Sequence, residues 1–382
     1  MAEQIKHSSR AHAMLSASSA ARWLACPPSA VAAAAYENTS SEYAAEGTMA
    51  HEVAEIVARE GIRPETGGDG FAADVTAEML DCAAGYRDYI QEQIRTPDAV
   101  QMLERRVDFS AYVPDGFGTC DCIIIQGDTL TIIDYKYGKG VAVSAENNPQ
   151  MRLYALGALN DYGIAYDVEN VEMHIYQPRI NNISTERLTV SDLLEWAEDV
   201  VKPTAAKAAK GKGDYSPGAH CRFCPHAGRC RALTRVCTEY VTTHGARTAV
   251  PVLAPHEVAD VLQMEPLVTL WLKRVREQAM TTMLDGGEIP GYKIVEGRQG
   301  ARRWTDEHQV AGLLDNAGYT RDEYTTTTVF SPAGMDKALG KKKVEELLSG
   351  CIERAPGSPT IVPASDKRPP YDRMAEARKD FE

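Results

Sequence analysis

The sequence predicts a mixed α/β fold, in which helices flank a central sheet. The first hundred residues are rich in segments whose apolar side chains recur at helical spacing. Three short apolar runs of strand length follow them, and then come a helical segment and a further strand. Elements in this order typically build one sheet with helices packed on its faces. At 382 residues the chain is long enough for this core and a second, smaller region.

The helices are predicted from their apolar periodicity and from the breaks in it. Met79, Ala83 and Tyr86, for example, recur every three to four residues and would share one helix face. Two consecutive prolines, Pro27-Pro28, interrupt the first helical segment. The predicted helices span residues 16–35, 44–60, 76–95, 148–161, 190–209 and 255–285, the last of them broken near Pro266.

The predicted strands span residues 102–110, 119–125, 130–136, 171–177 and 290–296. Gly127-Asp128 separates the second strand from the third, and a two-residue Gly-Asp loop is typical of a type II′ hairpin turn. A loop at these two residues sets a register in which Asp121 lies opposite Asp134. Lys136 follows two residues after Asp134 and projects from the same face, because side chains alternate along a strand.

This register predicts a cluster of charged groups at one place. The Cβ atoms of Asp121 and Asp134 would lie about 4.5–5.5 Å apart. Like charges at this distance repel, and a divalent cation with oxygen ligands would offset the repulsion. Two acids and the positive charge of Lys136 together point to a metal-dependent phosphodiesterase. The alternative interpretation is a surface hairpin that carries scattered charges.

Composition and charge narrow the class of protein. The hydrophobic, charged and aromatic fractions are those of an ordinary globular protein. No apolar run approaches the roughly 18 residues that a membrane span needs, and the first residues lack the pattern of a secretory signal. We therefore expect a cytoplasmic protein without a membrane partner. The net charge of −13 argues against a generic nucleic-acid coat protein.

Positive charge is nevertheless concentrated in one stretch, residues 202–235. Eight Lys and Arg residues occur there against a single acid, Asp214. The stretch is either a track that meets phosphates or, in its Ala-, Lys- and Gly-rich first part, a solvated linker. Arg222 and Arg229 within it, and Arg302 and Arg303 beyond it, are candidate DNA contacts.

Nine cysteines in a chain expected to be cytoplasmic are more consistent with metal ligands than with disulfides. Cys221, Cys224 and Cys230 have the spacing C-x2-C-x5-C, in which the first two thiolates can reach one metal. A fourth ligand is needed, and two cysteines are available. Cys237 would complete a local zinc knuckle, whereas Cys26 would join two distant segments through the metal.

These motifs together resemble a known family. His51, Asp121, Asp134-x-Lys136 and Gln150-x3-Tyr154 are similar, in this order, to the motifs of the RecB-type nuclease domain of the PD-(D/E)XK superfamily. The segment from Leu15 to Pro27 is similar to the N-terminal signature of the same group. With the three clustered cysteines, the chain resembles the subset that carries a [4Fe–4S] cluster, including the AddB-type and CRISPR-adaptation nucleases. The match covers about residues 15–235.

The resemblance implies a metal site for Mg²⁺ or Mn²⁺. His51, Asp121 and Asp134 would bind the cation, with the backbone carbonyl of Tyr135 as a further ligand. A carboxylate often lies near the histidine in this family, and Glu52 and Glu55 are both available for that position. Glu104, which precedes the hairpin, is a candidate accessory acid.

The resemblance also implies the roles of the other site residues. Lys136 would position or deprotonate the attacking water and stabilise charge on the phosphate. Gln150 would orient the site, and Tyr154 would contact the DNA backbone. In the iron–sulfur subset one upstream and three downstream cysteines bind the cluster, here Cys26, Cys221, Cys224 and Cys230. We expect that cluster to be structural.

Taken together, the predicted fold is a PD-(D/E)XK restriction-endonuclease-like core with an iron–sulfur staple. The predicted regions are a nuclease domain over residues 1–240, an accessory α+β region over 241–354 and a tail over 355–382. The predicted activity is a Mg²⁺- or Mn²⁺-dependent DNA exonuclease acting on ends or single strands, similar to phage-encoded enzymes of recombination, replication or repair. A single-strand-annealing or single-strand-binding protein would be a partner. The alternatives are a non-catalytic DNA-binding scaffold and a zinc-knuckle interaction protein that uses Zn²⁺ in place of the cluster.

Overall fold

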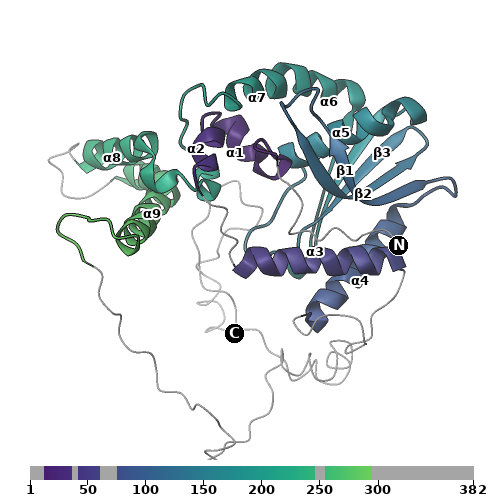
Figure 1. The fold of residues 1–382 in the computed structure, drawn as a ribbon, viewed down its shortest axis with the longest axis horizontal. Helices are drawn as coiled ribbons and strands as arrows, with labels where there is room; N and C mark the ends of the chain where they lie inside the picture. Colours follow the sequence, from purple (N-terminus) through teal and green to yellow (C-terminus); the bar gives the residue numbers. More distant parts are fainter. Residues whose placement is uncertain (1–12, 37–41, 61–74, 246–253, 294–382) are drawn as a thin grey trace, which may run out of the picture. The chain divides into compact units, whose positions relative to one another are not determined.

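The computed structural model describes residues 13–36, 42–60, 75–245 and 254–293 (Figure 1). All of them belong to the unit Met1–Val295. The predicted strand and helix segments that fall on these residues can be compared with the structure, whereas Arg302 and Arg303 lie outside them.

A five-stranded mixed sheet forms the centre of the fold and confirms the predicted α/β class. Its strands lie in the order β1-β2-β3-β4-β5, all neighbours being antiparallel except the parallel pair β3 and β4. Parallel neighbours need a crossover connection, which the helix α5 supplies. The strands are β1 Val100–Asp108, β2 Phe117–Gln126, β3 Thr129–Tyr135, β4 Asn170–Gln177 and β5 Asn182–Thr189.

The β2–β3 hairpin has the register predicted from its turn. Cys122 pairs with Ile133 and Ile125 pairs with Leu130, so Gly127 and Asp128 form the two-residue loop. Gly127 has a φ of 56°, a left-handed conformation that glycine adopts without a steric cost, while Asp128 is not among the positive-φ residues. A positive φ at the first loop position alone is the pattern of a type II′ turn.

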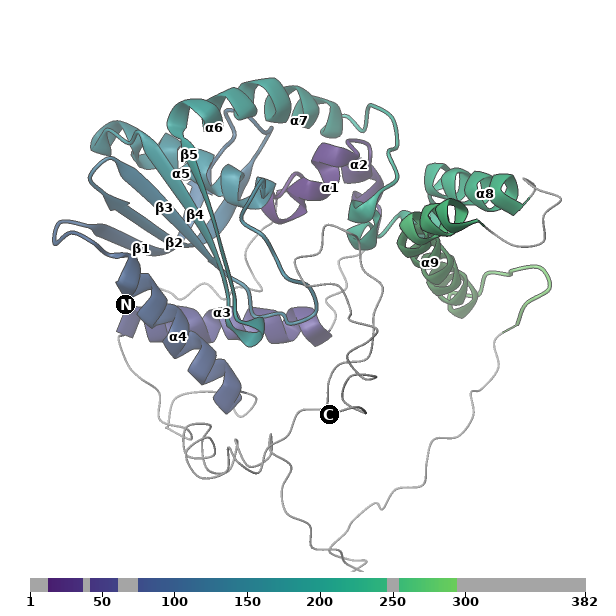
Figure 2. The ribbon, with the colours of Figure 1, turned by 180° about the vertical axis from the view of Figure 1, so that it is seen from behind.

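Helices cover both faces of the sheet (Figures 1 and 2). The helix α5, Pro149–Tyr166, packs on one face, where Ile123 and Ile132 are fully buried. The helices α3, Glu42–Glu60, and α4, Ala77–Gln93, pack on the other face over Ile124 and Ile133. Alternate residues of β2 and β3 thus enter different cores, as the period of two along a strand requires.

Short helices near the N-terminus and a helical run after β5 complete the core on the side of the sheet that α5 covers. Trp23, near the N-terminus, is fully buried there together with Val201 and Ala205. The predicted helix over 190–209 is a continuous helical run that contains one wider π turn. The segments are η2 Ala17–Ser19, α1 Ala20–Ala25, α2 Ser29–Ala34, α6 Val190–Trp196, η4 Ala197–Val201 and α7 Lys202–Ala208.

Three expectations about secondary structure were wrong or incomplete. Residues 290–293, the described part of the segment predicted as a strand over 290–296, contain no strand. The strand β5 was not predicted, because its inward side is polar: Glu186 is buried but forms an ion pair with Arg152 of α5. The predicted break at Pro266 does not occur, since α9 runs without interruption over Pro255–Leu284. Pro266 is exposed, and Leu262, whose carbonyl loses its helical partner, is also exposed, so water can satisfy that carbonyl.

The close approach of α5 to β1 depends on Gly157. A Cβ atom at this position would lie 2.8 Å from Cβ of Val107 and 2.9 Å from its Cγ2. We expect Gly157→Ala to lower the free energy of unfolding by about 1–3 kcal/mol, because it overpacks a buried contact. The measurement is denaturant unfolding. Gly163→Ala on the same helix meets its nearest atom at 3.5 Å and should be neutral or stabilising by up to about 1 kcal/mol. Equal effects of the two changes would contradict this packing argument.

Candidate active site and cysteine cavity

Two buried carboxylates lie where the β2–β3 hairpin ends. Asp121 and Asp134 are only 9% and 2% exposed. Oδ2 of Asp121 accepts a hydrogen bond of 2.8 Å from the backbone N–H of Tyr135, so the backbone of β3 passes directly beside this carboxylate. The predicted juxtaposition of the two hairpin acids is therefore present at the end of the sheet.

Lys136 and Gln150 surround the second carboxylate. Nζ of Lys136 lies 2.7 Å from Oδ2 of Asp134, and Nε2 of Gln150 donates a hydrogen bond of 3.2 Å to Oδ1. Nζ of Lys136 also donates to Oε1 of Gln150 at 3.4 Å. Asn148 caps α5 by accepting a bond from the N–H of Gln150, which places Gln150 in the first turn of the helix.

Tyr154 lies one helical turn after Gln150, as the i, i+4 spacing predicts. Nε2 of Gln150 lies 3.2 Å from the hydroxyl of Tyr154. The tyrosine ring is buried, and it packs over Gly118 of β2, where an added Cβ would lie 2.7 Å from its Cε1. Because Gly118 has no side chain, the ring of Tyr154 can pack directly against the sheet.

His51 joins the site from α3. Its Nδ1 lies 3.5 Å from Oδ2 of Asp121, and its ring stacks edge to face on Tyr135. Ligand atoms of His51, Asp121 and Glu104 all lie within 4.8 Å of one another. The sequence left Glu52 and Glu55 open beside the histidine and Glu104 as an accessory acid, and of these three Glu104 is the one in this group. Glu55 instead forms an ion pair of 2.9 Å with Arg59.

Glu104 reaches the group through a local distortion of β1. The paired residues Leu103 with Cys122 and Arg105 with Cys120 bracket Glu104 and Asp121. Glu104 itself has a φ of 50°, which is uncommon for a non-glycine residue and interrupts the regular alternation of side chains. The β1–β2 register was the signal that could have indicated Glu104, but sequence reasoning had not determined that register.

Burial and mutual charge set the protonation of the group. Burial raises the pKa of Asp134 above its usual value, with Asp121 adding to the rise and Lys136 opposing it. Burial acts in the same direction on Asp121, but the attraction of His51 and Lys136 outweighs it and lowers the pKa of Asp121. Burial would lower the pKa values of His51 and Lys136, but the neighbouring aspartates raise both. The buried site therefore contains anionic and cationic side chains next to each other.

A second cluster forms where the N-terminal helices meet the segment after α7. Cys26, Cys221, Cys224 and Cys230 line one cavity, although Cys26 is almost two hundred residues away in sequence. The short helices η5, Ala219–Phe223, and η6, Ala227–Arg229, carry the downstream cysteines into place. The structure thus brings together the four cysteines that the resemblance implied as ligands.

The sulfur atoms of this cavity accept hydrogen bonds. The backbone N–H of Gly218 donates to Sγ of Cys221 at 3.4 Å, and that of Leu233 donates to Sγ of Cys230 at 3.5 Å. The guanidinium of Arg22 lies beside Cys224 and opposes the rise in its thiol pKa that burial causes. Donors aimed at sulfur favour thiolates, the form that binds metals.

Cys237 belongs to the same buried apolar cluster as Cys221 and Cys224, but it does not line the cavity. It is buried in α8, Arg231–Gly245, with its Sγ directed at the carbonyl of Leu267 of α9. The two helices also meet through Nε1 of Trp271, which donates a 3.2 Å bond to the hydroxyl of Thr234. The geometry therefore groups Cys26, rather than Cys237, with the three clustered cysteines.

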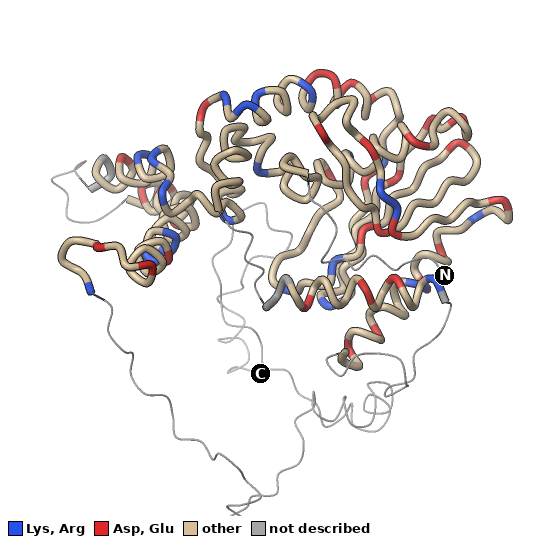
Figure 3. Tube along the Cα trace, viewed as in Figure 1, with Lys and Arg blue, Asp and Glu red and all other residues tan. Residues whose placement is uncertain are grey.

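The candidate basic residues are on the surface of this segment. Arg222 and Arg229 are exposed, in η5 and η6. Figure 3 shows further Lys and Arg residues along α7, where Lys202 forms an ion pair of 2.8 Å with Glu198. The Ala- and Lys-rich first part of the stretch is not a solvated linker throughout, because it forms α7, whose Ala205 and Ala208 are buried in the core. A track that meets phosphates stays a prediction.

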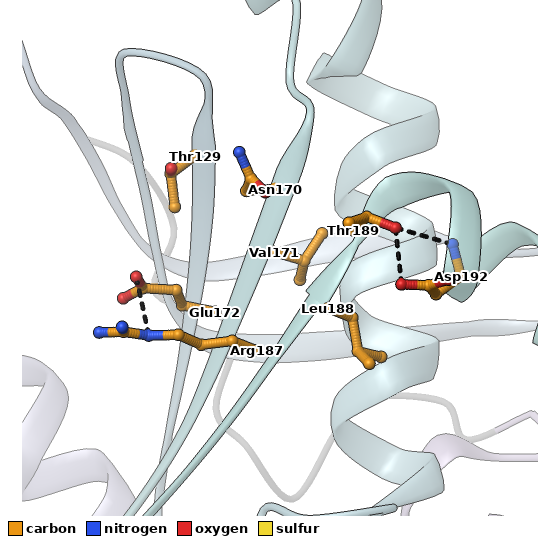
Figure 4. Close-up of a pocket in the computed structure, with 8 residues that line it drawn as sticks. All are labelled: Thr129, Asn170, Val171, Glu172, Arg187, Leu188, Thr189 and Asp192. Carbon is orange, nitrogen blue, oxygen red and sulfur yellow. Dashed lines mark hydrogen bonds and ion pairs between the residues drawn. The ribbon is translucent and has the colours of Figure 1, made fainter.

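A polar hollow of about 340 Å³ lies at the opposite end of the sheet (Figure 4). Thr129, the first residue of β3, lines it, whereas Asp134 lies near the end of that strand. Its charged and polar groups pair with one another: Glu172 with Arg187 and Thr189 with Asp192. This hollow is thus separate from the carboxylate site.

Comparison with known proteins places the chain in a family. The model of the DUF2800 family, described as a protein of unknown function, matches residues 12–369. The chain belongs to the DUF2800 family. The match spans both the carboxylate site and the cysteine cavity, so both sites lie within the part of the chain that defines a DUF2800 protein. Among solved structures, this DUF2800 chain is similar to one titled "Crystal structure of SSO0001", with 12% identity, 59% of this chain and 91% of the other covered, and a TM-score of 0.31.

No helix in the described part of this DUF2800 protein combines the length and the apolar character that crossing a membrane requires.

Proposed function

We propose that this DUF2800 protein is a Mg²⁺- or Mn²⁺-dependent DNA nuclease with a RecB-like core of the PD-(D/E)XK type. One observation carries the proposal: Asp121, Asp134 and Lys136 converge with His51 and Gln150 at one end of a mixed sheet. Oxygen and imidazole ligands beside a lysine suit a divalent cation and a phosphate group. An exonuclease that acts on ends or single strands is the activity we favour.

The side chains of this site fit a divalent cation. The ligand atoms of Glu104, Asp121 and His51 lie within 4.8 Å of one another and are the available ligands of one cation. Asp134, whose Oδ2 pairs with Lys136, is not part of that group and would join it as a further carboxylate ligand. Two carboxylates buried this close together repel each other unless a positive charge intervenes. When bound, Mg²⁺ or Mn²⁺ would polarise a phosphate group and lower the pKa of a water molecule.

The other residues would act on the substrate and on the ligands. Lys136 is in ionic contact with Asp134 and is thus a cation, which suits it to hold a phosphate oxygen and stabilise the charge that develops there. Gln150 donates to Asp134 and accepts from Lys136, so it fixes the orientation of both. Tyr154, whose hydroxyl lies beside the side-chain amide of Gln150, would contact the DNA backbone.

The cysteine cavity supports a second cofactor, a structural [4Fe–4S] cluster. Four cysteines from two distant segments line the cavity, and two of their sulfurs accept backbone hydrogen bonds. When bound, such a cluster would link the N-terminal helices to the segment after α7. The chain's own contacts across this junction, such as the hydroxyl of Tyr36 at 3.1 Å from Nδ1 of His226, hold the same two segments together.

A cleavage assay tests the proposed activity. The full chain, purified without oxygen, is incubated with end-labelled linear DNA and with circular DNA, in Mg²⁺, in Mn²⁺ or in a chelator. We expect degradation of linear DNA that requires the metal, and a loss of about 10²–10³-fold in rate for Lys136→Ala.

Lys273→Ala supplies the matched control, because Lys273 is exposed on α9 and forms an ion pair with Glu277 at the surface. It should retain the wild-type rate. An intact, metal-loaded protein that cleaves neither DNA would overturn the nuclease proposal in favour of a DNA-binding scaffold.

Metal binding at the carboxylate site should weaken as the pH falls. The pKa of His51 is raised, chiefly because the charge of Asp121 overcomes the effect of burial. An imidazolium cannot bind a cation, so protons compete with the metal more effectively below this raised pKa. Titration calorimetry with Mn²⁺ at about pH 8 and about pH 6 should give a lower affinity at the lower pH. His51→Asn should flatten that dependence, and an unchanged dependence would remove His51 from the site.

A further inference from the structure

The wall of the cysteine cavity contains a buried hydroxyl that lacks a partner. Ser29, the first residue of α2, is only 2% exposed and lines the cavity with the four cysteines. Its Oγ has no hydrogen-bond partner among the residues that the structure describes. A buried hydroxyl without a partner is unfavourable, and such groups are uncommon in native proteins.

The backbone holds this hydroxyl in place. The N–H of Ser29 donates to the carbonyl of Cys26 at 2.9 Å, and its own carbonyl accepts a 3.1 Å bond from Nη1 of Arg22. Ser29 is therefore tied to the turn that presents Cys26 and, through Arg22, to the helix α1 that precedes this turn. The remaining freedom of this side chain is rotation about χ1, which determines the group to which the hydroxyl can donate.

Other polar groups in the cavity wall are already engaged. Nε2 of His220 lies 2.8 Å from the carbonyl of Ser216, and Nδ1 of His226 lies 3.1 Å from the hydroxyl of Tyr36. The sulfurs of Cys221 and Cys230 accept backbone N–H groups. The hydroxyl of Ser29, by contrast, is a buried donor without a partner among the residues that the structure describes.

We propose that Ser29 donates a hydrogen bond to a sulfur atom of the [4Fe–4S] cluster and thereby raises the reduction potential of the cluster. This inference rests on the cofactor in the proposed function. A hydrogen bond to sulfur stabilises the reduced form more than the oxidised form, because the reduced cluster carries one more negative charge on its sulfurs. The same bond would give the buried hydroxyl of Ser29 the hydrogen-bond partner that it lacks.

The test is a redox titration of the full chain. Wild type, Ser29→Ala and Ser29→Thr are purified without oxygen, and their iron and sulfide contents are measured. The reduction potential is then followed by absorbance in the presence of mediator dyes. We expect equal iron contents, a more negative potential for Ser29→Ala, and a potential near wild type for Ser29→Thr, which keeps a hydroxyl.

Ser19→Ala is the matched control. Ser19 lies close by in sequence, but its hydroxyl already donates to the carbonyl of Ser16 and does not line the cavity. This variant should keep the wild-type potential. A loss of iron in Ser29→Ala that Ser29→Thr prevents would also support the contact.

Three further results would overturn the inference, and they can be told apart. Iron-loaded Ser29→Ala with the wild-type potential, or loss of iron in both Ser29 variants, would exclude the hydrogen bond and leave the cofactor proposal standing. Wild-type protein that carries zinc or no metal would overturn the cofactor proposal and the role of Ser29 together.

Discussion

Asp134→Asn is expected to lower the rate of DNA cleavage by at least about 10³-fold. The change removes the negative charge from the carboxylate that lies 2.7 Å from Lys136 and beside Asp121. The amide keeps the size of the side chain and can still accept the hydrogen bond from Gln150. A neutral ligand holds a divalent cation more weakly, so the bound metal and the orientation of Lys136 would be lost together.

The measurement is the initial rate of degradation of linear DNA in Mg²⁺, with the melting temperature as a check on folding. Asp128→Asn is the matched control, because Asp128 lies in the turn at the other end of the same hairpin and hydrogen-bonds to Thr129 and Asn170. It should retain activity. Full activity in folded Asp134→Asn would place the reactive centre elsewhere.

Cys26→Ser is expected to abolish binding of the cluster and to destabilise the protein strongly. Cys26 is the cysteine that the N-terminal helices contribute to the cavity, so without it a cluster bound there could no longer link these helices to the segment that carries Cys221. Loss of a bound metal belongs to the class of changes that cost at least about 4 kcal/mol, which lowers the melting temperature of a domain of this size by roughly 8–16 °C. The measurements are iron content and thermal unfolding.

Cys237→Ser is the control for this prediction. Cys237 is buried against α9 and does not line the cavity, so its replacement should keep the iron and cost only the packing of one side chain. The opposite result, in which Cys237→Ser loses the metal and Cys26→Ser keeps it, would indicate a local zinc knuckle over residues 221–237.

The hairpin is the part of the site that could be predicted best, and the reason is local. A Gly-Asp loop determines both the turn type and the strand register, and the register decides which residues face each other. Asp121, Asp134 and Lys136 follow from these few residues. Gln150 and Tyr154 likewise share a helix face because they are four residues apart.

Glu104 could not be assigned in this way. Its place beside Asp121 depends on how β1 pairs with β2 and on a left-handed backbone conformation that no local pattern indicates. The strand β5 was missed for a related reason: Glu186 is an inward residue whose burial is possible only because Arg152 of another element pairs with it.

Local sequence by itself determined the mixed α/β class, the turn and register of the hairpin, and the spacing of three of the cysteines, because these depend on interactions between near neighbours. The tertiary structure alone decided which distant groups meet. His51 reaches Asp121 from the helix α3 and Glu104 reaches it from the neighbouring strand β1, and Cys26 meets Cys221 although almost two hundred residues separate them in sequence. Such contacts between residues distant in sequence depend on how the helices pack on the sheet. That packing is a property of the whole buried core, which no short segment encodes.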